Sequence, residues 1–264
     1  MTGAPSLKRY HAGWHRAARF VAQRMVLRPV VRTVTKTKVE GLDNLEGLSR
    51  PFVVVANHAS HLDTGVLVSM LPRDVTEHLA VGAAADYFYS RWWTKVATSL
   101  FFNTYPIHRT SGGKRTRKGL SQRLVAEDVP VLIFPEGTRS RDGRMRTFKP
   151  GAAALCVAKN VPCVPVALLG THEAMPVGRS WPVPGRPRVR MLVGRPMRPR
   201  PGEKPREFND RVAARVRTML EMQTPYVLAD TPVGGIADDA AQAPAEGAAP
   251  GPVTGPDHKQ EEAS

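Results

Sequence analysis

Two side chains five residues apart, His58 and Asp63, are suited to general-base chemistry. A neutral imidazole can take a proton from a hydroxyl group, and a carboxylate bound to one ring nitrogen leaves the other nitrogen free to do so. On one regular helix the two side chains would point about 140° apart. We therefore expect a tight turn between a strand and a helix that brings both side chains to one point.

The same residues allow two other interpretations. Ser60 and Asp63 also fit a capping box, in which Asp63 serves the helix N-terminus. A carboxylate has several acceptor sites, so this role is compatible with binding the histidine. A metal site made of His58, His61 and Asp63 is the other alternative. No thiolate or third histidine lies nearby in the sequence, so we favour the general base and expect no metal.

A second polar cluster, Glu136, Gly137, Thr138 and Arg139, follows another apolar run. The glycine permits close backbone approach, and a guanidinium binds phosphate oxygens in a bidentate manner. Arg109 ends an earlier predicted strand. Each arginine by itself could be a solvated charge. Because these features recur after successive predicted strands, we expect a binding site for a phosphate ester.

The elements that must position these residues alternate along the chain. The expected strands are 33–39, 51–56, 76–82, 104–108, 130–134, 163–168 and 187–193, and the expected helices are 7–28, 63–71, 91–102, 112–126, 151–159 and 203–222. Strands separated by helices predict a single α/β domain with a mainly parallel sheet flanked by helices. In such sheets ligands bind at the carboxyl ends of the strands.

The chain is expected to have three parts. Residues 1–32 form an amphipathic helical segment, residues 33–228 the α/β domain, and residues 229–264 a tail. The tail has almost no large apolar residue and is rich in Ala, Gly, Pro, Asp and Glu, so we expect it to be disordered. Pro29 is expected to end the N-terminal helix.

The N-terminal helix carries apolar residues at three- and four-residue spacing, among them Trp14, Val21 and Met25, with arginines between them. Such a helix can lie in a bilayer interface. It could equally pack on the domain with a solvated basic face. The aromatic residues of the helix at 91–102 leave the same choice, between facing a membrane and forming core. These residues are Trp92, Trp93, Phe101 and Phe102.

Composition narrows the classes of partner. The 264 residues include 38 Lys and Arg against 23 Asp and Glu, a net charge of +15 at pH 7. This charge favours anionic partners such as an acidic bilayer surface. The chain lacks the interleaved aromatic and basic pattern of single-strand binders, so we expect no nucleic acid. Cys156 and Cys163 lie in apolar stretches and are expected to be reduced core residues.

No membrane-spanning or signal segment is expected. The first thirty residues contain many Lys and Arg and lack the apolar run of a signal peptide. The apolar stretch 51–72 is long enough to span a bilayer, but its polar centre at 57–63 would be stranded in hydrocarbon. A buried strand followed by a buried helix explains this stretch better.

Taken together, these segments resemble the glycerolipid acyltransferase superfamily, which contains bacterial 1-acyl-glycerol-3-phosphate acyltransferases. His58-x₄-Asp63 matches the first motif, residues 134–140 match the third, and residues 161–166 match the fourth. The second motif is only partly kept at residues 103–109, because Asn103 and Pro106 replace Gly and Phe while Arg109 holds. This departure bears on the identity of the acceptor more than on catalysis.

The resemblance implies transfer of a fatty acyl group from a thioester, acyl-CoA or acyl carrier protein, to the hydroxyl of lysophosphatidic acid, which gives phosphatidic acid. His58 would be the base and Asp63 would orient it. No cofactor beyond the thioester would be needed. The acceptor's glycerol phosphate would be held by Arg109, Glu136, Gly137, Thr138 and Arg139.

With its N-terminal helix and the aromatic residues at 91–102, the protein is expected to be peripherally bound to the cytoplasmic face of a membrane. Lys114, Arg115 and Arg117 would meet the phosphates of CoA or an acidic carrier protein. Another lysolipid or a glycolipid is the alternative acceptor. An alternative from a different class is a basic membrane-binding module without catalysis. That hypothesis leaves Glu136 and the His58–Asp63 pair without a role.

Overall fold

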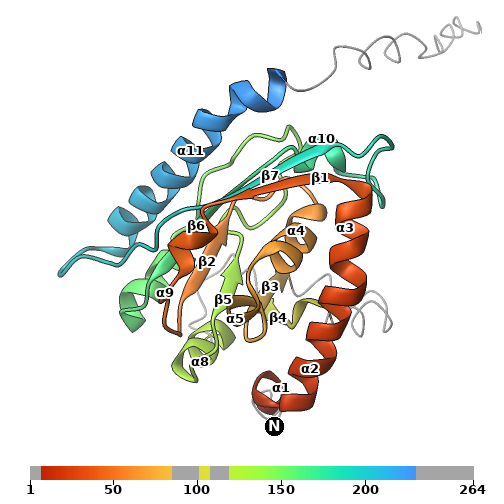
Figure 1. Ribbon diagram of the computed structural model, residues 1–264. Coiled ribbons are helices and arrows are strands. Elements are labelled where there is room, and N and C mark those ends of the chain that lie inside the picture. The colour runs from red at the N-terminus through yellow and green to blue at the C-terminus, as the bar shows by residue number, and fades with distance from the viewer. Residues whose placement is uncertain (1–6, 85–100, 108–118, 230–264) are drawn as a thin grey trace, which may run out of the picture. The chain divides into compact units, whose positions relative to one another are not determined.

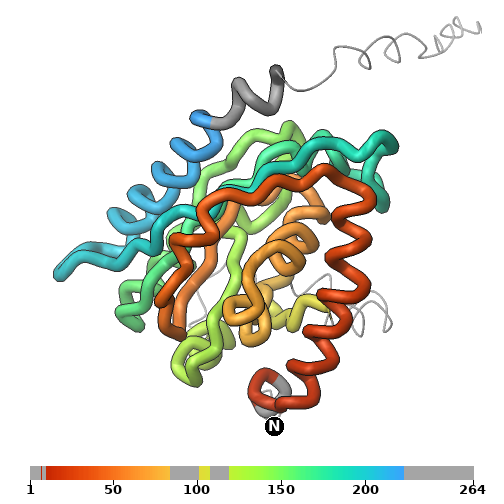
Figure 2. Tube along the Cα trace, in the orientation of Figure 1, coloured from red at the N-terminus to blue at the C-terminus, as the bar shows by residue number. Residues whose placement is uncertain are grey.

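The computed structural model describes residues 7–84, 101–107 and 119–229 (Figure 1). Seven strands in this part of the chain form one sheet in the order β1-β7-β6-β2-β5-β3-β4. The strands are β1 (Lys36–Glu40), β2 (Val53–Ala56), β3 (Ala80–Ala84), β4 (Thr104–Ile107), β5 (Val131–Ile133), β6 (Cys163–Leu169) and β7 (Arg188–Val193). The trace in Figure 2 shows how β2 and β5, far apart in sequence, run side by side, with Val53 paired to Val131.

The sheet is mainly parallel, as the sequence predicted. Strands β2 to β6 run in one direction, whereas β7 is antiparallel to β6 and parallel to β1. Strands β1 and β7 therefore begin at the edge where β2, β5 and β6 end. The loops that follow β2 and β5 lie at this edge, toward the top of Figure 1.

Helices cover both faces of the sheet (Figure 1). One face carries α8 (Leu120–Ala126), α9 (Gly151–Lys159) and α11 (Pro205–Ala229), and the other carries α3 (Arg28–Val34), α4 (Leu62–Met70), α5 (Arg73–Thr76) and α10 (Thr171–Ala174). Val53 and Val55 of β2 belong to one core cluster and Val54 to the other. The β-branched run of β2 is thus buried on both faces, which fixes the base of the turn that follows it.

The N-terminal helical segment continues past Pro29. It comprises α1 (Lys8–His11), α2 (Gly13–Val21), a π-helical stretch η1 (Ala22–Leu27) and α3. The prediction that Pro29 ends the helix was wrong. Pro29 lies in the first turn of α3, directly after the π-helical stretch. At that position the missing backbone N–H and the ring of proline are tolerated.

Two other expectations differ from the structure. The strand expected from residue 76 begins at Ala80, because the short helix α5 after Pro72 takes up Arg73–Thr76. The last helix continues to Ala229, past the expected end at 222. Most of the expected helix 91–102, the first part of 112–126 and the tail after 229 lie outside the described residues.

Within the described ranges, no helix is both long enough and apolar enough to cross a membrane.

Candidate active site

The turn after β2 brings His58 and Asp63 into contact. His58 Nδ1 and Asp63 Oδ2 are 2.8 Å apart, a hydrogen bond in which the ring nitrogen donates to the carboxylate. The Asp63 side chain is fully buried, and that of His58 keeps 18% of its surface exposed. With Nδ1 held by the carboxylate, Nε2 is the ring nitrogen left to accept a proton.

Asp63 also holds the turn itself. The same oxygen, Oδ2, accepts hydrogen bonds of 2.8 Å from the backbone N–H groups of Ala59 and Ser60. The Ser60 hydroxyl accepts from the N–H of Leu62 at 3.1 Å and donates to the carbonyl of Met175 at 2.7 Å. The capping role and the contact with His58 thus coexist on one carboxylate, as its acceptor capacity allows.

Asn57 attaches the start of the turn to the neighbouring strand. Its side-chain amide donates to the carbonyl of Leu168 and accepts from the N–H of the same residue, both at 2.8 Å. Asn57 is 3% exposed, so this pair of bonds is shielded from water. The turn that carries His58 therefore cannot move without disturbing β6.

The loop after β5 holds the backbone of His58 from the other side. Glu136 Oε1 accepts from the N–H of His58 at 2.8 Å, and Glu136 Oε2 accepts from the N–H of Arg146 at 3.1 Å. The carbonyl of His58 accepts from the N–H of Ser140 at 2.8 Å. The ring of Phe134 stacks on the imidazole with centroids 4.0 Å apart and planes 18° from parallel.

Burial raises the pKa of the Glu136 carboxyl to about 7, and the two backbone N–H groups oppose the shift by stabilising the carboxylate. The sequence placed Glu136 among the groups that hold the acceptor. In the structure it is 3% exposed, and both of its oxygens bind backbone N–H groups. These contacts were not predicted, because a contact with the backbone of His58 leaves no local signature in the sequence.

Positive charge borders the same turn. The pKa of His61 is lowered by burial first and by the charge of Arg139 second. Arg139 directly precedes Ser140, whose N–H donates to the carbonyl of His58, so the backbone of Arg139 lies beside this turn. Thr138 is exposed beside it. Arg109, Lys114, Arg115 and Arg117 lie outside the described residues.

Lys149 is a cation at this site that the sequence interpretation missed. Its N–H donates to the carbonyl of Pro135 at 3.0 Å. Its Nζ lies 3.0 Å from the position that a Cβ on Gly137 would occupy, and Gly137 has a φ of +73°. Among the described residues Lys149 has no ion pair with a carboxylate. It lies two residues before α9, and nothing in the local sequence distinguishes it from other exposed lysines.

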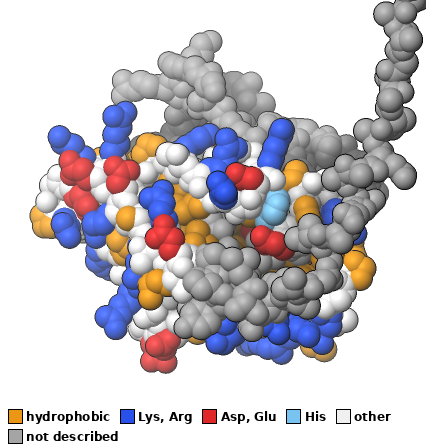
Figure 3. All heavy atoms as spheres, turned by 90° about the horizontal axis from the view of Figure 1, so that it is seen from above, with side chains coloured by type: hydrophobic (Ala, Val, Ile, Leu, Met, Phe, Trp, Pro, Cys, Tyr) orange, Lys and Arg blue, Asp and Glu red, His pale blue; other side chains and the backbone are white. Residues whose placement is uncertain are grey.

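The charge asymmetry is visible on the surface. Figure 3 shows Lys and Arg side chains spread over the described part of this face, with exposed hydrophobic side chains between them and fewer Asp and Glu. In the described ranges no group of three His, Cys, Asp or Glu side chains is placed to hold a metal ion. The alternative of a site made of His58, His61 and Asp63 therefore gains no support.

The fold resembles that of a solved protein. The crystal structure of the 1-acyl-sn-glycerophosphate acyltransferase PlsC from Thermotoga maritima matches with a TM-score of 0.60 and 23% sequence identity, over 81% of this chain and 90% of that chain. At this level of identity the match concerns the fold.

Curated relatives match over part of their length. A chloroplastic 1-acyl-sn-glycerol-3-phosphate acyltransferase of Brassica napus is 32% identical over 170 residues, which cover 61% of this chain and 45% of that protein. The 1-acyl-sn-glycerol-3-phosphate acyltransferase alpha of Mus musculus is 33% identical over 150 residues, 54% of this chain and 50% of that protein. The chain thus spans half or less of the length of these two relatives.

The profile of one protein family matches residues 36–169, just over half of the chain. The matched range contains β1 to β6, the His58–Asp63 turn and the loop that carries Glu136. On this match the chain belongs to the Acyltransferase family.

Proposed function

We propose that this protein transfers a fatty acyl group from an acyl thioester, acyl-CoA or acyl carrier protein, to the hydroxyl of lysophosphatidic acid, giving phosphatidic acid. The observation that carries the proposal is the 2.8 Å contact between His58 Nδ1 and Asp63 Oδ2 within the family-matched range. The names of the relatives, 1-acyl-sn-glycerol-3-phosphate acyltransferases, support the choice of acceptor.

The contact between His58 and Asp63 supports a direct transfer between two bound substrates. Asp63 accepts the Nδ1 hydrogen of His58, so Nε2 takes the proton from the acceptor hydroxyl as its oxygen attacks the thioester carbonyl. The new C–O bond forms and the C–S bond breaks. The imidazolium then gives its proton to the departing sulfur, which releases the free thiol and returns His58 to its neutral form. No covalent acyl-enzyme is required, because the acceptor oxygen itself attacks the thioester.

The acceptor's phosphate is proposed to bind at the loop after β5. Arg139 directly precedes Ser140, whose N–H binds the carbonyl of His58, and the Nζ of Lys149 lies 3.0 Å from the position of a Cβ on Gly137. Two cations beside one turn attract a phosphate, and a charge-assisted hydrogen bond is about twice as strong as a neutral one. The backbone of Gly137 and the exposed hydroxyl of Thr138 remain proposed contacts, as does Arg109.

The direct test is release of free thiol from an acyl-CoA in the presence of lysophosphatidate. His58→Ala should lose at least about two orders of magnitude in rate, because the base is removed. Asp63→Asn should also reduce the rate. Chelators should leave the activity of the wild type unchanged. Undiminished thiol release by His58→Ala would contradict the general-base assignment. A panel of other lysolipids under the same conditions decides between acceptors.

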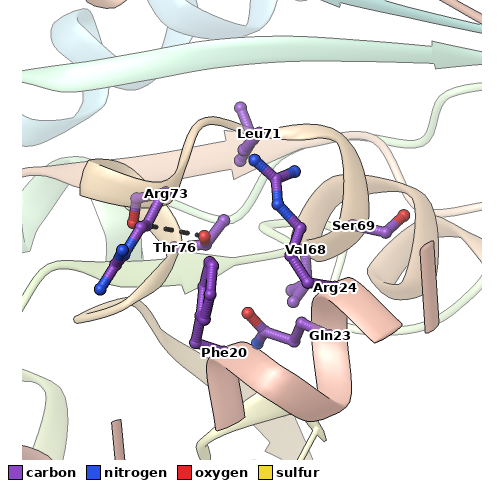
Figure 4. A pocket seen from close by; sticks show the side chains of 8 residues that line it. All are labelled: Phe20, Gln23, Arg24, Val68, Ser69, Leu71, Arg73 and Thr76. Carbon is purple, nitrogen blue, oxygen red and sulfur yellow. Dashed lines mark hydrogen bonds between the residues drawn. The ribbon is translucent and has the colours of Figure 1, made fainter. Parts of the chain in front are cut away.

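The orientation of the N-terminal helix supports peripheral binding to an anionic membrane. Its polar residues Arg19 and Gln23 are 3% and 6% exposed. Arg19 donates to the carbonyl of Glu77 at 3.1 Å and Gln23 to that of Phe101 at 2.6 Å. Figure 4 shows the contact between the N-terminal helix and the domain, where Phe20, Gln23 and Arg24 line a small pocket together with residues of the α4–α5 segment.

The opposite side of this helix is apolar and exposed. Trp14 is 71%, Val21 55% and Met25 72% exposed. A helix on the surface of a water-soluble protein normally buries its apolar side. Here Ala22 and Val31 are buried, but the apolar side between residues 14 and 25 faces away from the domain. The first acidic residue of the chain is Glu40, which leaves the segment purely cationic. An apolar face bordered by arginines suits the interface of an anionic bilayer. We place that bilayer surface on the cytoplasmic side.

A further inference from the structure

The surroundings of Glu136 are those of a side chain that serves the protein backbone. One carboxylate oxygen accepts from the N–H of His58 and the other from the N–H of Arg146, at 2.8 and 3.1 Å. The side chain is 3% exposed. Where it is ionised, this carboxyl group also repels a phosphate, since both are anions. An acceptor's phosphate would therefore bind the neighbouring cations and avoid Glu136.

We propose that Glu136 is a positioning residue, which fixes the backbone of His58 so that the imidazole keeps its place between Asp63 and the acceptor. The proposal rests on the acyl transfer proposed above, and it gives Glu136 a different role from the acceptor contact that the sequence suggested.

Two neighbouring contacts make the same loop a clamp. The N–H of Ser140 donates to the carbonyl of His58 at 2.8 Å, so both backbone polar groups of His58 bind this loop. Phe134 stacks on the imidazole at 4.0 Å. Asp63 fixes the ring through Nδ1. The loop after β5 thus holds the backbone of His58, and the turn holds its ring. Together these contacts prevent small displacements of the imidazole.

The loss of this clamp should act on the rate of the chemical step. Without Glu136 the N–H of His58 loses its buried acceptor, which is costly, so the turn relaxes toward another partner. A displacement of about 1 Å at a catalytic group can reduce a rate by about 10²-fold. Substrate binding at Arg139 and Lys149 would be unaffected, because neither cation contacts the Glu136 carboxylate through a hydrogen bond.

Steady-state kinetics of Glu136→Ala and Glu136→Gln test whether the loss falls on kcat and leaves the acceptor KM unchanged. We expect kcat to fall by about 10²-fold in the alanine variant, with the acceptor KM changed by less than about threefold. Glutamine should restore part of the rate, because its carbonyl oxygen can still accept from one N–H. Glu173→Gln, which removes an exposed carboxylate of α10, is the matched control and should behave as wild type. A raised acceptor KM with unchanged kcat in Glu136→Ala would instead make Glu136 an acceptor-binding residue and overturn the proposal.

A spectroscopic measurement tests the same role without turnover. In protein labelled with nitrogen-15 histidine, the Nδ1–H proton of His58 bound to Asp63 should give a downfield resonance, assigned by its loss in His58→Gln. We expect this resonance to shift or broaden in Glu136→Ala and, less, in Glu136→Gln. An unchanged resonance in both variants would refute positioning. Should the wild type show no acyl transfer to any lysolipid, the proposed function fails while this resonance still decides the role of Glu136.

Discussion

At the residue scale, the Glu136 carboxyl is subject to two opposing effects. Burial raises its pKa from 4.5 to about 7, although the N–H groups of His58 and Arg146 favour the charged form. The folded protein therefore binds a proton here at pH values where the unfolded chain has released it. The contribution of this group to stability is fully present below about pH 4.5 and is lost as the pH rises through about 7.

This linkage predicts how stability depends on pH. The free energy of unfolding of the wild type, relative to Glu136→Gln, should decrease between about pH 5 and about pH 8 by an amount on the order of 1–3 kcal/mol, because glutamine does not titrate. Urea denaturation of both proteins at the two pH values measures the difference. A difference that stays constant with pH would mean that Glu136 has no raised pKa in the folded protein.

Lys149 gives a second prediction at this scale. If its ammonium group binds the acceptor's phosphate, Lys149→Gln should raise the acceptor KM about 10- to 100-fold, the loss of one charge-assisted hydrogen bond. The effect on kcat should be smaller. Lys159→Gln, at the exposed end of α9, removes the same charge and should leave the KM unchanged. Equal effects in the two variants would indicate a general effect of charge and no specific contact.

At the scale of the element, the N-terminal helix is distinguished by which side it buries. Helical periodicity predicts its amphipathic character but cannot say which face meets the domain. The contacts of Arg19 with Glu77 and of Gln23 with Phe101 decide this, and they join residues far apart in the chain. Similarly, Pro29 is a helix breaker by local rules, but in the structure it lies in the first turn of α3, where a proline is tolerated, directly after the π-helical stretch.

The exposed side of this helix predicts the behaviour of a single charge substitution. Met25→Glu should weaken binding to anionic vesicles by at least about tenfold, because it places a charge where an apolar side chain would enter the interface. Met222→Glu is the matched control, since Met222 is 64% exposed but lies on α11. Co-sedimentation measures both. Equal binding by the wild type and Met25→Glu would count against this helix as the membrane contact.

At the scale of the whole molecule, the alternation of strands and helices was sufficient to predict the sheet, its mainly parallel character and the turn that joins His58 to Asp63. The direction of β7 was not predictable, because residues 187–193 alternate in the same way whichever neighbour they pair with. The clamp on His58 was also beyond local patterns. Glu136 lies far from His58 in sequence, and only the pairing of β2 with β5 brings their loops together.

The reversed direction of β1 and β7 has a consequence for how substrate reaches the enzyme. Because β1 runs against β2, the helix α3 that precedes it ends at the edge of the sheet where His58 lies, and Arg186, just before β7, donates to the carbonyl of Arg32 there at 2.7 Å. A helix resting on a bilayer would then hold the catalytic turn near the lipid headgroups. The acceptor would then arrive by lateral diffusion in the membrane. The rate of turnover would depend on the mole fraction of acceptor in the bilayer and not on its bulk concentration.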